Sequence, residues 1–180
     1  MSYQELNNPS DLFFAIGDAI LAAGLGVSVG NYDDFSGEVS DATVLIEIEG
    51  TGPALRGNDG RHGHQVSVTL HAVVARWRKH STLEAVNLAT CLERLVKDNR
   101  WGLPGVQCGV PEDQHSAPSM FQVGDGGYNA WGTRFTQWIS LGKPFMDDPE
   151  VKGLPLVAYA WEVTSLDDPA QYKPIGEALP

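Results

Sequence analysis

Two histidines separated by one residue form the pattern in this sequence that comes nearest to a metal site. His62 and His64 follow Asp59 in the glycine-rich stretch GTGPALRGNDGRHGH. Residues two apart in an extended chain project to the same side, so both imidazoles could reach one metal ion. A complete site needs further ligands, and none cluster nearby, because His71 falls on the opposite strand face. We therefore expect a polar turn that happens to hold two histidines, with no metal or other cofactor.

The other patterns that could support catalysis are incomplete. Three Asp–Asp pairs lack the spaced order of a calcium-binding loop and are typical of solvated turns. The glycine clusters GLGVSVG and GDGG match no phosphate-binding motif, and the sequence has no Gly-x-Ser-x-Gly nucleophile elbow. A Cys–His pair stays open as an alternative, although nothing in the sequence marks one. These observations favour a protein that is not an enzyme.

The charge balance limits the partners of this chain of 180 residues. It has 12 Lys and Arg against 23 Asp and Glu, giving a net charge of −11. Binding of nucleic acid by phosphate neutralisation needs a basic surface and is therefore disfavoured, whereas an acidic surface past which DNA moves is compatible with this charge. The one dense basic stretch is RWRKH, from Arg76 to His80. We expect it to form local ion pairs or to meet an acidic neighbouring subunit.

The cysteines and the N-terminal residues indicate a cytoplasmic setting. Two cysteines are too few for a disulfide scaffold, and we expect Cys91 to pack as a reduced thiol among the apolar residues of a helix. The stretch MSYQELNNPSDLF does not resemble a signal peptide. No apolar run approaches the roughly 20 residues of a membrane-spanning helix. We expect folding and assembly in a reducing cytoplasm, with no membrane partner.

Apolar residues at helical spacing predict two helices. The first spans about 11–23, with Ser10 as its N-cap and Gly24 as its C-cap. The second spans about 82–99 and is introduced by a capping box of Ser81 and Glu84. Its apolar stripe suits packing on a sheet and comprises Ala85, Leu88, Ala89, Leu92, Leu95 and Val96.

Alternating apolar residues predict the strands. A brief strand is expected near VSV, and ATVLIEIEG and HQVSVTLHAVVARW match as an antiparallel pair with one buried face. Their connection, from Gly50 to Gly63, is long for a hairpin, so we expect a mobile functional loop carrying Arg56 and Arg61. The segment VQCGVPEDQHSAPSMFQVGDGG is strand-like at both ends and turn-rich in the middle.

The strand predicted for 128–142 carries large aromatic residues on both faces. Trp131 and Phe135 share one side, and Trp138 lies on the other. A half-buried strand is normally polar on its outer face, so the second face needs a partner of its own. The pattern does not say which face belongs to the core. We expect the other face to contact an adjacent subunit or the C-terminal arm.

These elements predict a fold of the α/β class (α+β type). The domain, residues 1–142, would hold a mostly antiparallel sheet of about four to five strands covered by two helices. Residues 143–180 would form a C-terminal arm, too short and rich in proline to own a core. The arm carries Tyr159 and Trp161, which must be buried either on its own domain or on a neighbouring subunit. Both arrangements stay open.

The order of these elements resembles the tail terminator proteins of long-tailed bacteriophages. The resemblance rests on FAIGDAILAAG, the two paired strands with their long connection, STLEAVNLATCLERLV and YNAWGTRFTQWISLG. It implies a hexameric ring that caps the tail tube, stops its polymerisation and joins the tail to the head-side connector. The partners implied are further copies of the chain, the tail tube protein, the connector or neck protein and, in contractile tails, the sheath protein. DNA would only pass through the lumen, and the location would be the tail–neck junction of the virion.

Two function classes follow from the sequence. The favoured class is a structural virion protein, either a tail terminator or another neck or head–tail joining adaptor. The less favoured class is a small soluble metal-binding protein that uses the His62–His64 pair. For the structural class we predict interface residues on the long connection, on the aromatic strand and on the arm: Arg56, Arg61, Trp131, Trp138, Tyr159 and Trp161.

Overall fold

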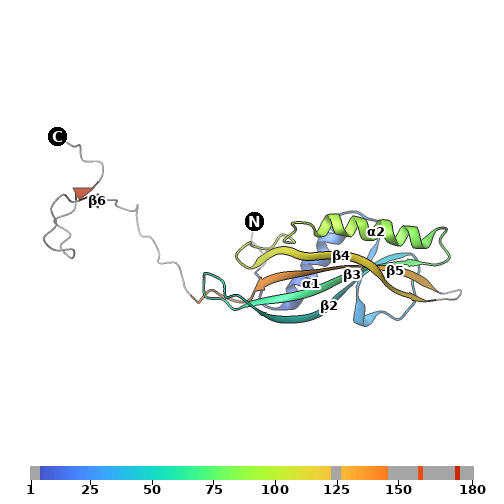
Figure 1. Ribbon diagram of the computed structural model, residues 1–180, viewed down its shortest axis with the longest axis horizontal. Helices are drawn as coiled ribbons and strands as arrows, with labels where there is room; N and C mark the ends of the chain where they lie inside the picture. The colour runs from blue at the N-terminus through green and yellow to red at the C-terminus, as the bar shows by residue number, and fades with distance from the viewer. Residues whose placement is uncertain (1–4, 123–126, 146–157, 160–172, 175–180) are drawn as a thin grey trace. The chain divides into compact units, whose positions relative to one another are not determined.

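Five strands form one open sheet in the computed structural model, which describes residues 5–122, 127–145, 158–159 and 173–174 (Figure 1). The strands are β1 (Ser28–Asn31), β2 (Ala42–Ala54), β3 (Gly63–Ala75), β4 (Cys108–Gln122) and β5 (Tyr128–Ser140). Their order across the sheet is β1-β2-β3-β5-β4, with β1 parallel to β2 and every other neighbouring pair antiparallel. This confirms the predicted fold class, a mostly antiparallel sheet with two helices.

Both helices cover the same face of the sheet. These are α1 (Pro9–Ala22) and α2 (Ser81–Val96), the latter lying along β3, β4 and β5 (Figure 1). A single-turn 3-10 helix, η1 (Tyr32–Asp34), follows β1. The core between helices and sheet contains fully buried residues from each layer, among them Leu12, Ile16, Ile20, Val44, Ile46, Val68, Leu70, Leu92, Phe135 and Ile139. The opposite face of the sheet carries neither α1 nor α2, and we call it the open face.

The first helix begins two residues earlier than predicted. Asn8, rather than Ser10, is its N-cap, and Pro9 occupies the first turn, where its missing N–H costs nothing. The Asp11 carboxylate accepts hydrogen bonds from the backbone N–H groups of Asn7 and Asn8, at 2.8 and 2.9 Å. Free N–H groups at this helix end are thereby satisfied by an acidic side chain, as the helix dipole favours.

The predicted capping box of the second helix is wrong. His80 is the N-cap, with a left-handed backbone at φ 64°, and Ser81 lies inside the helix. Ser81 Oγ accepts a hydrogen bond from Asn129 Nδ2 at 2.8 Å, and Glu84 pairs with Arg78 Nε at 2.6 Å. Both side chains are therefore occupied by tertiary partners that the local pattern does not reveal. Cys91 was also predicted wrongly, because its thiol is exposed on α2.

The β2–β3 ladder runs much further than the sequence suggests. Val44 and Ile46 lie opposite Ala72 and Leu70 on the core face, as the alternation predicts. After a register shift between Ile48 and Gly50, pairing resumes and continues to Ala54 opposite Gly63. The long loop predicted for 50–63 is therefore reduced to residues 55–62. β3 pairs with β5 along its whole length, so it offers a fixed template that holds even the Gly- and Pro-containing end of β2.

Strand β4 is continuous where a turn-rich middle was predicted. It follows β5 from Cys108 to Gln122 with three register shifts. It contains Pro111 and Pro118, which a central strand would not accommodate but an edge strand does. The irregular register accounts for the turn-like pattern in its sequence.

Strand β5 places its two aromatic faces in different environments. Phe135 and Ile139 are fully buried beneath the helices, so this side is the core face. Its polar members are satisfied there, since Gln137 Oε1 accepts a hydrogen bond from Trp101 Nε1 at 2.7 Å and Thr133 Oγ1 donates to the Ala89 carbonyl at 3.3 Å. Trp138 projects to the open face.

The chain divides into two units, Met1–Met146 and Asp147–Pro180. In the second, β6 (Ala158–Tyr159) pairs antiparallel with β7 (Lys173–Pro174). Among the residues that the structure describes, no helix is both long and apolar enough to span a membrane.

Candidate functional site

The turn between β2 and β3 is held by hydrogen bonds within the turn and to β5. Gly57 N–H donates to the Arg61 carbonyl and Gly60 N–H donates to the Gly57 carbonyl, each at 3.0 Å. Trp138 Nε1 donates to the Leu55 carbonyl at 3.1 Å, which fastens the turn to β5. Only glycine fits at position 63, because a Cβ there would collide with the Leu55 carbonyl and the Trp138 indole. The sheet end that contains this turn is called the hairpin end below.

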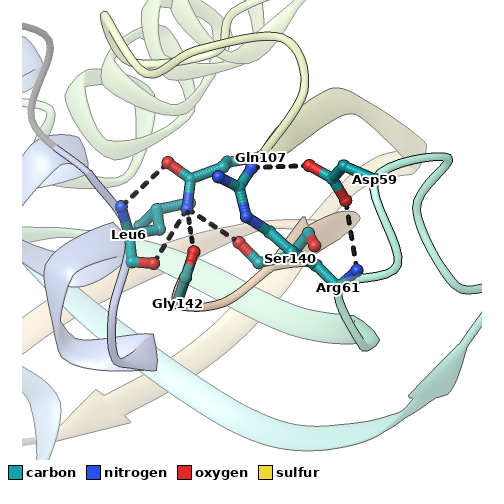
Figure 2. Close-up of polar contacts among 6 residues, drawn as sticks. All are labelled: Leu6, Asp59, Arg61, Gln107, Ser140 and Gly142. Atoms are coloured by element: carbon teal, nitrogen blue, oxygen red, sulfur yellow. Dashed lines mark hydrogen bonds and ion pairs between the residues drawn. The ribbon is translucent and has the colours of Figure 1, made fainter. Parts of the chain in front are cut away.

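A buried arginine stabilises the turn at the hairpin end. Arg61 is only 8% exposed, and its Nη1 lies 2.8 Å from Asp59 Oδ2 (Figure 2). The backbone N–H of Arg61 donates to Asp59 Oδ1 at 3.1 Å. Arg61 Nε and Ser140 Oγ have no hydrogen-bond partner among the described residues. Arg61 thus stabilises the turn through its ion pair with Asp59. It was predicted as an interface residue, but its side chain is buried rather than at the surface.

Gln107, on the approach to β4, joins two further segments at the same end of the sheet. Its Oε1 accepts a hydrogen bond from Leu6 N–H at 3.3 Å, and its Nε2 donates to the carbonyls of Leu6, Ser140 and Gly142 at 3.0, 3.2 and 3.4 Å (Figure 2). Gln107 is 1% exposed and Leu6 is fully buried, so without the Gln107 side chain the Leu6 N–H would be buried without a partner. Phe145 N–H also donates to the Asp59 carbonyl at 3.0 Å. The N-terminal segment, the approach to β4 and the residues after β5 are therefore held together.

A surface hollow of about 800 Å³ lies beside this fixed turn. Its apolar lining includes Trp138, Leu55 and Val106, and its polar lining includes Arg56 and Glu112. Leu55 and Val106 are 87% and 64% exposed, so much of this apolar surface faces water. Exposed apolar groups gathered around a concave surface are typical of a binding site for another protein. We call it the Trp138 hollow.

The opposite end of the sheet presents an exposed aromatic residue. Trp77, in the turn between β3 and α2, is 68% exposed, and Leu83 in the first turns of α2 is 62% exposed. Arg78 fixes this turn through ion pairs with Asp41 and Glu84. The hydrogen bond to Glu84 and the charge of Asp41 raise the pKa of the Arg78 guanidinium, with burial acting in the opposite sense. We call this turn, residues 76–80, the Trp77 corner.

Polar side chains cross-link the strands on the open face. His71 Nε2 lies 2.8 Å from Glu47 Oε2, and the imidazole stacks on Tyr32 with ring centroids 4.9 Å apart. Glu49 accepts a hydrogen bond from Thr69 Oγ1 at 2.6 Å and pairs with Arg134 Nη2 at 2.6 Å. These contacts join β2, β3 and β5. A small apolar cluster of Leu45, Val73 and Ala130, with Tyr32, Phe35, Val39 and Tyr128 against it, covers one part of this face.

Neither histidine of the sequence motif lies in a ligand cluster. His62 contacts the Phe145 ring edge-on, with centroids 5.9 Å apart, and His64 belongs to β3. Within residues 5–122 and 127–145 and the two short strands that follow, no three His, Cys, Asp or Glu side chains are placed to hold a metal ion. Burial raises the pKa of the Cys108 thiol to about 12, so this cysteine stays protonated at neutral pH.

The structure brings together only part of the predicted interface. Arg56 and Trp138 both line the Trp138 hollow, whereas Trp131 lies half-buried against the core on the helix side of β5. Tyr159 belongs to β6 in the second unit, and Trp161 lies outside the described residues. The prediction missed Leu55, Val106 and Trp77. Of these, Trp77 carried a signal, as the one aromatic residue within the basic stretch RWRKH.

Comparison with models of protein families and with curated proteins gives no match to this chain.

Proposed function

We propose that this chain is a structural virion protein that forms a ring on the end of a phage tail tube. In this role it would end tube polymerisation, join the tail to the head-side connector and act without catalysis. Its partners would be further copies of itself, the tube protein and a neck protein, with a sheath protein added in a contractile tail. It would assemble in the host cytoplasm and reside at the tail–neck junction.

The observation that carries this proposal is the pair of unlike exposed sites at the two ends of one sheet, an apolar hollow at one end and an indole in a basic turn at the other. A ring forms when each subunit offers one surface to the next subunit and a different surface to the previous one. The Trp138 hollow and the Trp77 corner are such a pair, one concave and one projecting. Each is held by its own polar contacts, so little conformational entropy would be lost when it binds.

The charge of the chain supports a role around DNA rather than on it. With a net charge of −11, subunits arranged around a lumen would repel the phosphates of DNA that passes through. A protein that gripped DNA would need the opposite balance. The acidic character is therefore consistent with a passage that must let DNA move freely.

Deletion of the gene from the genome that carries it tests the proposal. Electron microscopy of the resulting particles should show filled heads without joined tails, together with tubes of uncontrolled length. Supplying the unmodified chain from a plasmid should restore joined tails of uniform length. Tails of normal length attached to filled heads in the deletion strain would contradict the tail-terminator assignment.

A further inference from the structure

The exposed sites at the two ends of the sheet are complementary in shape and in polarity. The Trp138 hollow is large enough to admit an aromatic side chain, and its apolar lining of Trp138, Leu55 and Val106 would cover one. The Trp77 corner offers an indole that is 68% exposed. Aromatic residues that enter a desolvated pocket are common anchors of protein interfaces.

The charged groups at the two sites also correspond. Arg76 and Lys79 lie close to Trp77 in the chain, and both are exposed. Neither makes an ion pair with a described residue, whereas Arg78 pairs with Asp41 and Glu84. Glu112 lines the hollow and Asp113 follows it on β4, both exposed. Arg56, which also lines the hollow, supplies a guanidinium that can stack on an indole face.

We propose that Trp77 of one copy of this chain inserts into the Trp138 hollow of the next copy. The indole packs on Leu55 and Trp138 while Arg76 and Lys79 approach Glu112 and Asp113. This inference rests on the proposed ring and names the contact that builds it.

The two sites cannot meet within one copy. They lie at opposite ends of β3, which has 13 residues and a rise of about 3.3 Å per residue. The contact must therefore run from one subunit to another, head to tail, and each subunit keeps one free site until the ring closes.

Mixing two variants provides the test, with light scattering on the full chain over a range of concentrations up to the millimolar. Trp77→Ala removes the projecting group and Leu55→Asp spoils the hollow, and both positions are exposed, so the fold should persist. Each variant alone should associate about 30-fold more weakly, the loss expected of one interface anchor. A mixture should form a one-to-one dimer, because each variant supplies the site that the other lacks.

Phe14→Ala serves as the control, since Phe14 is 60% exposed on α1 and belongs to neither site. It should assemble like the unmodified chain. If the unmodified chain associates and the mixture stays monomeric, the contact is overturned while the ring proposal stands on other surfaces. An unmodified chain that stays monomeric throughout also overturns the contact, and the proposed function is then decided by the gene deletion.

Discussion

Gln107 uses both ends of its amide group to hold four backbone groups of two segments at the hairpin end. These segments lie 101 and 33 to 35 residues from Gln107 in sequence. Because the Gln107 side chain is buried, water does not reach its amide group, and these contacts supply the hydrogen bonds that water would otherwise make. Gln107 therefore acts on the Trp138 hollow indirectly, by fixing the backbone from which the neighbouring Val106 projects.

Replacement of Gln107 by Leu should destabilise the protein. The Leu6 N–H would lose its partner in a buried position, which costs roughly 1–3 kcal/mol for each group left unsatisfied. Chemical denaturation monitored by tryptophan fluorescence should show a lower midpoint. Gln65→Leu is the matched control, since the Gln65 side chain makes no hydrogen bond to a described residue and its loss should leave the midpoint nearly unchanged. Equal midpoints for the two variants would show that the Gln107 contacts are not stabilising.

The two cysteines should respond differently to a thiol reagent. Cys91 is exposed and should react in the folded protein, whereas Cys108 is buried and should react only after unfolding. Titration of free thiols before and after denaturant should give one and then two equivalents. Two fast equivalents in the folded protein would contradict the burial of Cys108.

Cys108 should also make the stability pH-dependent at alkaline pH. Its pKa is raised to about 12 in the folded state, from 9.0 for an unperturbed thiol. Between these values the unfolded chain has lost the proton that the folded chain keeps, so the free energy of unfolding falls as pH rises from 9 towards 12. Cys108→Ala should flatten this fall relative to the unmodified chain. Identical slopes for the two proteins would contradict the assignment.

The sequence was a good guide to single residues wherever local alternation decides their position. It placed Trp131 and Trp138 on opposite faces of one strand, and the structure agrees. It did not identify Gln107 or the burial of Arg61, because both depend on partners brought together by the fold. A buried polar residue that bonds several distant segments does not belong to an apolar repeat, so hydrophobic periodicity does not reveal it.

At the scale of elements, α2 is held by one stripe of residues packed on the sheet. Leu92 is fully buried in that stripe, whereas Leu83 on the same helix is 62% exposed. Leu92→Ala should lower the free energy of unfolding by about 2–5 kcal/mol, as truncation of a buried leucine typically does. Leu83→Ala should have little effect, because the side chain is already in water and alanine is a good helix former. Similar losses for both variants would show that the helix packs differently.

The helices and the first part of the β2–β3 pair were predictable because each carries its own apolar period. The outer half of that hairpin and the middle of β4 were not, since their glycines and prolines argue locally against a strand. Both are kept in the sheet by a regular neighbour, β3 in one case and β5 in the other. The predicted capping box failed for a related reason, as Asn129 and Arg78 engage its two side chains.

At the scale of the whole molecule, the domain Met1–Met146 is asymmetric along its strands. One end carries a hollow fixed by Arg61 and Gln107, and the other carries Trp77 on a turn fixed by Arg78. Repetition of such a head-to-tail contact gives a closed ring when the rotation closes, and an open filament otherwise. A ring is the outcome that would stop the growth of a tail tube, which itself has no natural end.

The mass of the assembled chain tests this account most directly. Size-exclusion chromatography with light scattering on the unmodified protein should show concentration-dependent growth towards one limiting species, six times the subunit mass of 19.5 kDa for a hexamer. Negative-stain images of that species should show closed rings with an open lumen. A limiting species of two subunits, or filaments that lengthen without limit, would contradict a closed head-to-tail ring.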